Sequence, residues 1–464
     1  MLANCTLNTT IPVIHPLPIP TQVFETTTDN ICYDIRNCRT TLNILWSCLA
    51  TIFACTWVAI HPNIPPRGEH WFRRLGRQVI TTIIAIIAPE LIVCWAAKQY
   101  FASKRLAQRF KAYGFTHTHG FFVTMGGFVL YDRAEPVQRL TQELMRSENH
   151  ILVMKYNFWS RPSPTCPIPR VTEEEIKNMS KGDWFSKCLA LFQTTWFIMQ
   201  CIGRGVQKLP LTELELATCA FAVLNVVTYG LWWNKPKSVD CPVAIRRHIP
   251  SSNTPTSRTW GRNSFKDLVG WFKSTKNTFS DVQLLAKHIW GNAGMLLYNN
   301  NWLLVPLLPL SPFVQVLVGG ETPEGQQSVG TYYSGDLGNK DLLAVQVILV
   351  ACSTIFGAIH CMAWSFEFES HLVQILWRSC SLVIAVFPIT EFGLWMVVRD
   401  PNFSIWFTYS DTCRGYLGRL LMVICLLVYI TARITLLVLA FMQLASLPLG
   451  AYQTVSWTNF IPHI

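Results

Sequence analysis

Four ionisable side chains lie inside long apolar runs of this sequence, where a charge is costly: Glu90, His360, Glu391 and Arg433. A charged group at the centre of a membrane helix costs roughly 2.5–3.5 kcal/mol on insertion scales, so such a residue normally has a partner or a function. Carboxyl, imidazole and guanidinium groups at that depth can transfer protons or hold charged substrates. These four residues are therefore the first candidates for chemistry.

Glu90 directly follows Pro89 in the apolar run 79–97. The proline ring removes a backbone hydrogen bond, so free carbonyl groups are expected around this position. A carboxyl group without a charged partner in an apolar site tends to keep its proton, as a general acid or a proton-coupled site requires. The same Pro-Glu pair also fits a purely structural function, at the start of the second half of a broken helix.

Glu391 and Arg433 belong to consecutive apolar runs, 379–398 and 420–444, which we expect to be antiparallel neighbours. Counted from the connected ends of these runs, the two residues differ in depth by roughly 9 Å. Two long side chains can close that distance. We therefore predict a structural ion pair between Glu391 and Arg433.

His360 lies toward the expected cytosolic end of the run 342–366, and Trp364 follows it by one helical turn. A lone histidine on an apolar helix is most often a hydrogen-bonded packing residue, and a catalytic function is the alternative. Trp95 and Trp364 offer aromatic faces that can stabilise a developing cation. We name Glu90 and His360 as catalytic candidates and the two tryptophans as candidates for substrate binding.

The composition explains why these side chains are unusual. Half of the 464 residues are hydrophobic and only 14% are charged, whereas about 25% is usual for a soluble protein. Several runs of 18 or more residues contain no charge, as bilayer-spanning helices do. This pattern excludes a soluble enzyme, a secreted disulfide scaffold and a nucleic-acid-binding protein, although the formal net charge is +11.

We predict an all-α integral membrane protein: a helical bundle of about seven spans plus one re-entrant or broken helix, with two long basic cytosolic loops. The predicted apolar runs are 41–60, 79–97, 188–203, 216–233, 289–318, 342–366, 379–398 and 420–444. The run 79–97 is interrupted at Pro89 and Glu90, so we expect this run to be the re-entrant one.

The distribution of lysine and arginine predicts the orientation in the membrane. Segment 234–287 holds ten basic and three acidic residues, and segment 98–187 holds fourteen basic and eight acidic residues, so both are expected in the cytosol. Segment 319–341 has four acidic residues and one lysine and is expected on the opposite face. This scheme places the N-terminus outside and the C-terminus in the cytosol, in the endoplasmic reticulum or the plasma membrane.

A second scheme stays open because the linker 61–78 contains four arginines. If the run 79–97 crosses the bilayer completely, the N-terminus is cytosolic and these arginines lie outside. We prefer the first scheme, in which that run does not cross.

The runs and loops divide the chain into five parts. They are an exoplasmic N-terminal segment 1–40, a first membrane part 41–233 that includes the cytosolic loop 98–187, a basic cytosolic loop 234–288, a second membrane part 289–447 and a cytosolic tail 448–464. Three sequons fall on the exoplasmic side, and we predict glycosylation at Asn4, Asn8 and Asn402.

Four of the sixteen cysteines are expected on the exoplasmic side: Cys5, Cys32, Cys38 and Cys413. They are an even number in an oxidising compartment, and Cys32 and Cys38 are near enough in sequence to close a short loop. No cysteine pair has C-x-x-C spacing, and no nucleotide-binding or metalloprotease motif occurs. We therefore expect no metal and no cofactor.

Several short strings together are similar to a large family of multi-pass membrane proteins from filamentous and mushroom-forming fungi. They are Asn37-Cys38-Arg39-Thr40, His61-Pro62-Asn63-Ile64-Pro65, Ala88-Pro89-Glu90 with Trp95-Ala96 and Gln99, Thr118-His119-Gly120-Phe121-Phe122 with Met125-Gly126-Gly127-Phe128, Ser180-Lys181-Gly182-Asp183, Gln200-Cys201 with Arg204, Thr212-Glu213-Leu214-Glu215, Trp232-Trp233 with Lys235-Pro236, and Phe356-Gly357 with His360-Cys361 and Trp364. The family is functionally uncharacterised, so the resemblance implies a multi-pass membrane fold but no reaction. It adds Arg204 and Glu213 to the candidates for substrate binding.

Three functions are compatible with these residues. The first is a membrane-embedded biosynthetic enzyme on a hydrophobic isoprenoid or lipid substrate, terpene cyclase-like, with Glu90 as the general acid. The second is a proton-coupled transporter or channel, because carrier sites use broken helices and buried carboxyl groups. The third is a membrane receptor or scaffold with the long cytosolic loops as its output. The expected partners are membrane lipids and a hydrophobic small molecule, with no nucleic acid.

Overall fold

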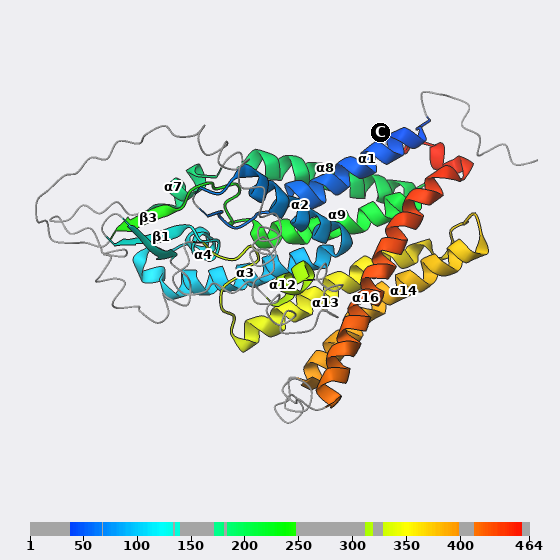
Figure 1. Ribbon diagram of the computed structural model, residues 1–464. Coiled ribbons are helices and arrows are strands. Elements are labelled where there is room, and N and C mark those ends of the chain that lie inside the picture. The colour runs from blue at the N-terminus through cyan, green and yellow to red at the C-terminus, as the bar shows by residue number, and fades with distance from the viewer. Residues whose placement is uncertain are drawn as a thin grey trace, which may run out of the picture.

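The computed structural model describes residues 38–66, 68–132, 135–139, 171–180, 183–246, 311–318, 328–398 and 413–456. Most of these residues are helical. Five helices are long and apolar enough to cross a membrane: Thr41–Val58, Glu213–Trp232, Asn339–Ser365, His371–Gly393 and Ile424–Ala445. Figure 1 shows that these helices pack into a bundle, with a small region of mixed helices and strands at one end.

The long helices of the bundle are α1 (Thr41–Phe53), which continues as a π-helical turn (Ala54–Val58), α8 (Asp183–Val206), α9 (Glu213–Trp232), α13 (Asn339–Cys361), α14 (His371–Val398) and α16 (Cys413–Met442). Short 3₁₀ turns cover Lys111–Tyr113, Met362–Ser365, Gln443–Ala445 and Leu449–Tyr452. The sequence itself defines the start of α9 through a capping box. The Thr212 hydroxyl accepts the Glu215 amide at 3.2 Å, and the Glu215 carboxylate accepts the Thr212 amide at 3.0 Å.

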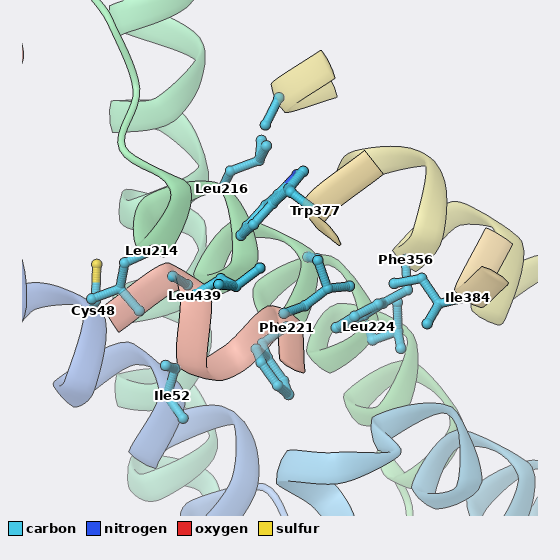
Figure 2. Close-up of a cluster of buried hydrophobic side chains, with 14 of the residues drawn as sticks. Cys48, Ile52, Leu214, Leu216, Phe221, Leu224, Phe356, Trp377, Ile384 and Leu439 are labelled. Carbon is cyan, nitrogen blue, oxygen red and sulfur yellow. The ribbon is translucent and has the colours of Figure 1, made fainter. Parts of the chain in front are cut away.

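Helix α9 lies at the centre of the bundle. It contacts α1, α8, α13, α16 and α3 (Pro89–Arg109). Figure 2 shows the apolar side chains that fill the spaces between these helices: Cys48, Ile52, Leu214, Leu216, Phe221, Leu224, Phe356, Trp377, Ile384 and Leu439. Close packing of this kind fixes the helices relative to one another, so polar groups that several helices contribute can meet at defined distances.

The broken helix expected at 79–97 is present. Helix α2 (Trp71–Ile87) and α3 meet at an angle of 113° at Ala88. Pro89 takes the first position of α3, where its missing amide hydrogen has no cost. Arg74 near the start of α2 pairs with Asp240 at 2.7 Å, and Gln99 farther along α3 contacts Lys235, so both helices lead to the same end of the bundle.

The chain enters and leaves the described bundle at one end, which we call the Arg39 end. Cys38 and Gln453 form a β-bridge, and the Arg39 amide donates to the Tyr452 carbonyl at 2.8 Å. The Arg39 side chain pairs with Glu215 at the start of α9. In Figure 1 the blue start of α1 accordingly lies beside the red end of the chain. Cys38 and Gln453, which the sequence scheme assigns to opposite faces, thus lie side by side.

The opposite end, called the Lys235 end, gathers the loop after α1, the residues after α9 and the residues that follow α12 (Ser311–Val318). Asn63 Nδ2 donates to the carbonyls of Gly330 and Tyr333 at 3.1 and 3.0 Å. The described residues of segment 319–341, expected on the face opposite the basic segment 234–287, thus lie at the same end of the bundle as Lys235.

A small folded region, called the head, adjoins the Lys235 end (Figure 1). It contains α4 (His117–Thr124), α7 (Glu173–Asn178) and a three-stranded sheet in the order β2–β1–β3, formed by Phe128–Asp132 (β1), Glu135–Arg139 (β2) and Val243–Arg246 (β3). Strand β1 is antiparallel to β2 and parallel to β3. Parts of the two long basic loops thus fold together, and the all-α prediction lacked this sheet.

Candidate functional site

The first buried polar cluster is the Glu90 triad, formed by Glu90, Tyr429 and Arg433. Glu90 lies in the first turn of α3, inside the bundle, and is only 3% exposed. Arg433 Nη2 forms an ion pair with Glu90 Oε2, and the Tyr429 hydroxyl donates to Glu90 Oε1 at 2.7 Å. Arg433 Nε also donates to the Tyr429 oxygen at 3.2 Å. Both oxygens of the carboxylate are therefore occupied by donors from α16.

Aromatic rings surround the arginine of this triad. The guanidinium carbon of Arg433 lies 3.8 Å from the centre of the Phe356 ring on α13 and 5.3 Å from that of the Tyr429 ring. Rings in this position attract a cation and keep lipid and water away from it. The Glu90 triad therefore joins α3, α13 and α16 through a shielded ion pair.

These contacts correct two predictions. The predicted ion pair between Glu391 and Arg433 is wrong, because Arg433 binds Glu90. The sequence also left Glu90 without a partner, whereas the break at Ala88 brings it against α16. Glu391 lies on the exposed side of α14, and no ion pair within the described ranges includes it.

The second buried polar cluster is the Lys235 cage, formed by His61, Trp95, Gln99, Trp232 and Lys235. The Lys235 side chain is fully buried. Its Nζ donates to the His61 carbonyl and, at 2.7 Å, to Gln99 Oε1. The same nitrogen lies 4.7 Å from the centre of the Trp95 ring and 4.6 Å from that of the Trp232 ring. Trp232 and Lys235, which the sequence analysis quoted only within a string that resembles a family, are both buried.

Gln99 connects this cage to the rest of the Lys235 end. Its Oε1 also accepts the Trp232 indole N–H at 3.0 Å, and its Nε2 donates to Asn63 Oδ1 and to the Tyr333 carbonyl, both at 2.9 Å. A buried amide that uses both its oxygen and its nitrogen in this way fixes the position of its partners. Four segments distant in sequence are thus held by one side chain.

The electrostatics of the Lys235 cage differ from those of an ion pair. Burial, and secondarily the nearby Lys187, lower the pKa of Lys235 well below its usual value. Lys187 is itself buried and donates to the carbonyls of Trp233 and Lys235 at 3.0 and 3.2 Å. These carbonyls follow the C-terminal end of α9, where the helix dipole favours positive charge. Within the described ranges no carboxylate pairs with Lys235.

His360 has contacts typical of a packing residue. Its Nδ1 donates to the Phe356 carbonyl at 2.9 Å, and its ring stacks on Phe356 with ring centres 4.7 Å apart. The Trp377 indole donates to the His360 carbonyl at 3.1 Å. These contacts favour the packing interpretation, which the sequence left open beside catalysis.

The predicted tryptophans do not flank Glu90. Trp95 belongs to the Lys235 cage, and Trp364 is 43% exposed. The Arg378 guanidinium carbon lies 5.1 Å from the centre of the Trp364 ring, and Arg378 Nη2 donates to the Trp364 carbonyl at 2.7 Å. Glu90 therefore does not lie between the indole rings of Trp95 and Trp364, as a cyclase-like site would require.

Arg204 and Glu213 lie at the Arg39 end, one length of α9 away from the Lys235 cage. The buried Arg204 guanidinium donates to the carbonyls of Pro210 and Gln453, both at 2.6 Å. The Glu213 carboxylate is hydrogen-bonded by Gln443. These residues secure the C-terminal segment to the start of α9 and share no site with Trp95 or Trp364. The predicted glycosylation sites Asn4, Asn8 and Asn402 lie outside the described residues.

Sequence reasoning missed Tyr429 and the binding function of Gln99. Tyr429 could have been found because it precedes Arg433 by four residues and therefore shares its helix face. Gln99 is part of a string that resembled the fungal family, but nothing in its neighbourhood indicated its partners. Those partners come from 36 to 234 residues away in the chain.

Comparison with known proteins gives one match. A model described as a family of unknown function (DUF8562) matches residues 14–112, 104–252 and 337–464. No curated protein and no solved structure matches the chain. The matched ranges contain every member of the Glu90 triad and of the Lys235 cage.

Proposed function

We propose that this chain, which belongs to the family of unknown function DUF8562, is an integral membrane transporter in which Glu90 couples proton movement to solute movement. One observation carries the proposal. A helix broken by 113° brings a carboxyl group into the interior of an apolar bundle, where it meets an arginine and a tyrosine of another helix. Carriers place their binding and coupling sites at such breaks, and intramembrane charges are retained for transport or proton transfer.

The topology that belongs to this proposal has six crossing helices: α1, α8, α9, α13, α14 and α16. Helices α2 and α3 enter from the Lys235 end and return to it, so they form a re-entrant pair. Of the run 289–318 only α12 (Ser311–Val318) is described, and β3 before it and residues 330–333 after it both lie at the Lys235 end. The proposal therefore has six crossings where the sequence predicted seven, with Cys38 and Gln453 together at the Arg39 end.

Two observations support an orientation of this bundle. Strands β1 and β3, which come from the basic segments 98–187 and 234–287, both lie at the Lys235 end, and this supports a cytosolic position for that end. Cys38 at the Arg39 end is disulfide-bonded, as expected in an oxidising exoplasmic compartment. The Cys32 partner suggested by the sequence lies outside the described residues.

The Glu90 triad can act as a switch. A proton that reaches Glu90 removes the negative charge that holds Arg433, and the released guanidinium can then bind an anionic group of a solute. Loss of that proton restores the ion pair and expels the anion. The hydroxyl of Tyr429 donates to Glu90 in the closed pair and can follow the proton, because a phenol both donates and accepts hydrogen bonds.

The enzyme alternative has less support from the geometry. A cyclase-like reaction would use a free carboxyl acid facing aromatic surfaces that can stabilise a cation. Both oxygens of Glu90 are bound, and the aromatic faces beside it already cover Arg433. A receptor or scaffold function would use the head, for which no binding surface is distinguished.

The proposal is tested in proteoliposomes that contain a pH-sensitive dye. Amino acids, carboxylates and sugars are added outside, and proton entry is recorded for the parent protein, for Glu90→Gln and for Glu391→Gln as a matched control. We expect solute-driven proton entry in the parent and in the Glu391 variant, and its loss in the Glu90 variant. Equal proton entry in all three proteins, or none in any of them, would contradict the proposal.

A further inference from the structure

We infer that Asn225 forms an internal binding site for a hydroxyl group, supplied by water or by a hydroxylated solute, between the Glu90 triad and the Lys235 cage. The inference deepens the proposed transport function and rests on it. It rests on Asn225, which lies in the middle of a face of α9 that connects the two clusters.

That face of α9 carries Phe221, Asn225, Tyr229 and Trp232, spaced four, four and three residues apart. This spacing places successive members on one side of a helix, roughly 5–6 Å apart along its axis. All four side chains are at most 4% exposed. The face therefore forms a continuous line through the interior of the bundle.

Both ends of this line reach the buried clusters. The Phe221 ring packs edge to face against the Phe356 ring with centres 5.3 Å apart, and Phe356 carries the guanidinium of Arg433 (Figure 2). At the other end the Tyr229 ring lies 6.0 Å from the His61 ring, and Trp232 belongs to the Lys235 cage. Asn225 lies one helical turn from Phe221 and one turn from Tyr229.

The Asn225 amide is buried at 3% exposure, and neither its Nδ2 nor its Oδ1 has a hydrogen-bond partner among the described residues. An amide with neither group satisfied is expensive inside a protein, and more than nine in ten buried polar groups are paired. A buried and unpaired amide therefore indicates a partner that the described residues do not supply, and we assign it to a bound molecule.

The local backbone around this line is consistent with a site. The π-helical turn Ala54–Val58 of α1 contacts α9, and Ala54 packs with Tyr229. Single π-turns inside helices occur frequently at functional positions because they widen the helix locally. The turn of α1 that contacts Tyr229 is thus π-helical rather than α-helical.

The chemistry of the amide defines the class of occupant. An asparagine side chain offers two N–H donors and one carbonyl acceptor, so its partner should both donate and accept. A hydroxyl group does both without bringing a charge to a helix face whose members Phe221, Asn225, Tyr229 and Trp232 are themselves uncharged. Water and the hydroxyl of a polyol or an isoprenoid alcohol share this chemistry.

The test uses cysteine accessibility in the reconstituted full-length chain. Asn225→Cys is compared with Leu224→Cys, an adjacent control whose parent side chain is 2% exposed and lies in the apolar cluster. Both proteins are treated with aminoethyl methanethiosulfonate, and the modified peptide is identified by mass spectrometry among the native cysteines. We expect the new thiol of Asn225→Cys to react at least tenfold faster than that of Leu224→Cys, and equal rates would overturn the inference.

Addition of glycerol or farnesol separates the two sources of the hydroxyl group. Slower modification of Asn225→Cys in either alcohol assigns the site to a hydroxylated solute, and unchanged fast modification assigns it to water. Because the labelling rate does not depend on transport, a failure of the proton-entry assay leaves this result valid, and the reverse also holds.

A second measurement needs no variant. Hydroxyl-radical footprinting of the parent protein compares Phe221, beside the site and 4% exposed, with Phe122, which is fully buried in the apolar core of the head. Radicals form where water is present, so we expect several-fold more oxidation of Phe221. Equal oxidation of the two phenylalanines would also overturn the inference.

Discussion

The Glu90 triad and the Lys235 cage are both buried, and α3 contributes residues to both. They differ in how a buried ionisable side chain is stabilised. In the triad, an acid and a base neutralise each other and a tyrosine completes the hydrogen bonding. In the cage, a lysine is held by a carbonyl, an amide oxygen and two indole rings, with no described carboxylate.

In the proposed transport mechanism the triad is the cluster that changes state, because a proton on Glu90 removes the negative side of its ion pair with Arg433. A Lys235 that loses its proton still has two N–H donors for its two acceptors and loses only its charge over the two indole rings. We therefore regard the triad as the switch and the cage as the tie that holds α3 and α9 together.

The largest effect is expected when the triad is broken from one side. Arg433→Met removes the partner of Glu90 and should lower the free energy of unfolding by about 3–5 kcal/mol, because the carboxylate stays buried without compensation. Thermal unfolding in detergent measures this loss.

The double variant Arg433→Met with Glu90→Leu should recover much of the stability, since it removes both charges. Glu391→Gln, on the exposed side of α14, serves as the control and should unfold like the parent. A double variant no more stable than the single one would show that the pairing is not energetically coupled.

A smaller effect is expected when the cage is opened. Lys235→Met keeps the length of the side chain but leaves the His61 carbonyl without its lysine donor, so stability should fall by about 1–2 kcal/mol at neutral pH. Trp232 still donates to Gln99 Oε1 in this variant, which limits the loss. A loss as large as that of Arg433→Met would remove the distinction between switch and tie.

The cage should also have its own pH dependence. Because burial lowers the pKa of Lys235 in the folded state, the unfolded chain binds one more proton between that lowered pKa and the usual value of 10.5. The free energy of unfolding should therefore rise with pH across this window. Unfolding measured at increasing alkaline pH should show this rise in the parent and a reduced rise in Lys235→Met, and parallel pH profiles would contradict the assignment.

The smallest effect is expected from Tyr429→Phe. This change removes the donor to Glu90 Oε1 but leaves the ion pair with Arg433, so the loss should be about 1 kcal/mol. In the proton-entry assay the same variant should shift the pH dependence of transport rather than abolish it. Complete loss of transport with normal stability would make the hydroxyl group an obligatory proton carrier and not an auxiliary donor.

The sequence identified members of both clusters without their arrangement. It named Glu90 and Arg433 because charge in an apolar run is costly, and it quoted Trp95, Gln99 and Lys235 within strings that resemble a family. It paired Arg433 with Glu391 because consecutive helices are usually neighbours. The pairing failed because the partner of Arg433 is Glu90 on α3, 343 residues away in the chain.

The sequence by itself determined the apolar helices, the capping box at Thr212 and the helix break at Pro89. These features depend on local physics: the hydropathy of consecutive residues, hydrogen bonds over three positions and a ring that removes an amide hydrogen. For the same reason, the prediction that the run 79–97 is interrupted at Pro89 is confirmed.

Only the tertiary structure decided which end of the bundle each segment joins and which buried groups meet. Asn63 binds carbonyl groups around residue 330, and Arg39 binds Glu215 and the chain beyond residue 450, across separations that no periodic pattern encodes. Such contacts form because buried polar groups must find partners once the helices pack. The choice of partner depends on the helix directions, and here the turn at Ala88 brought Glu90 to Arg433.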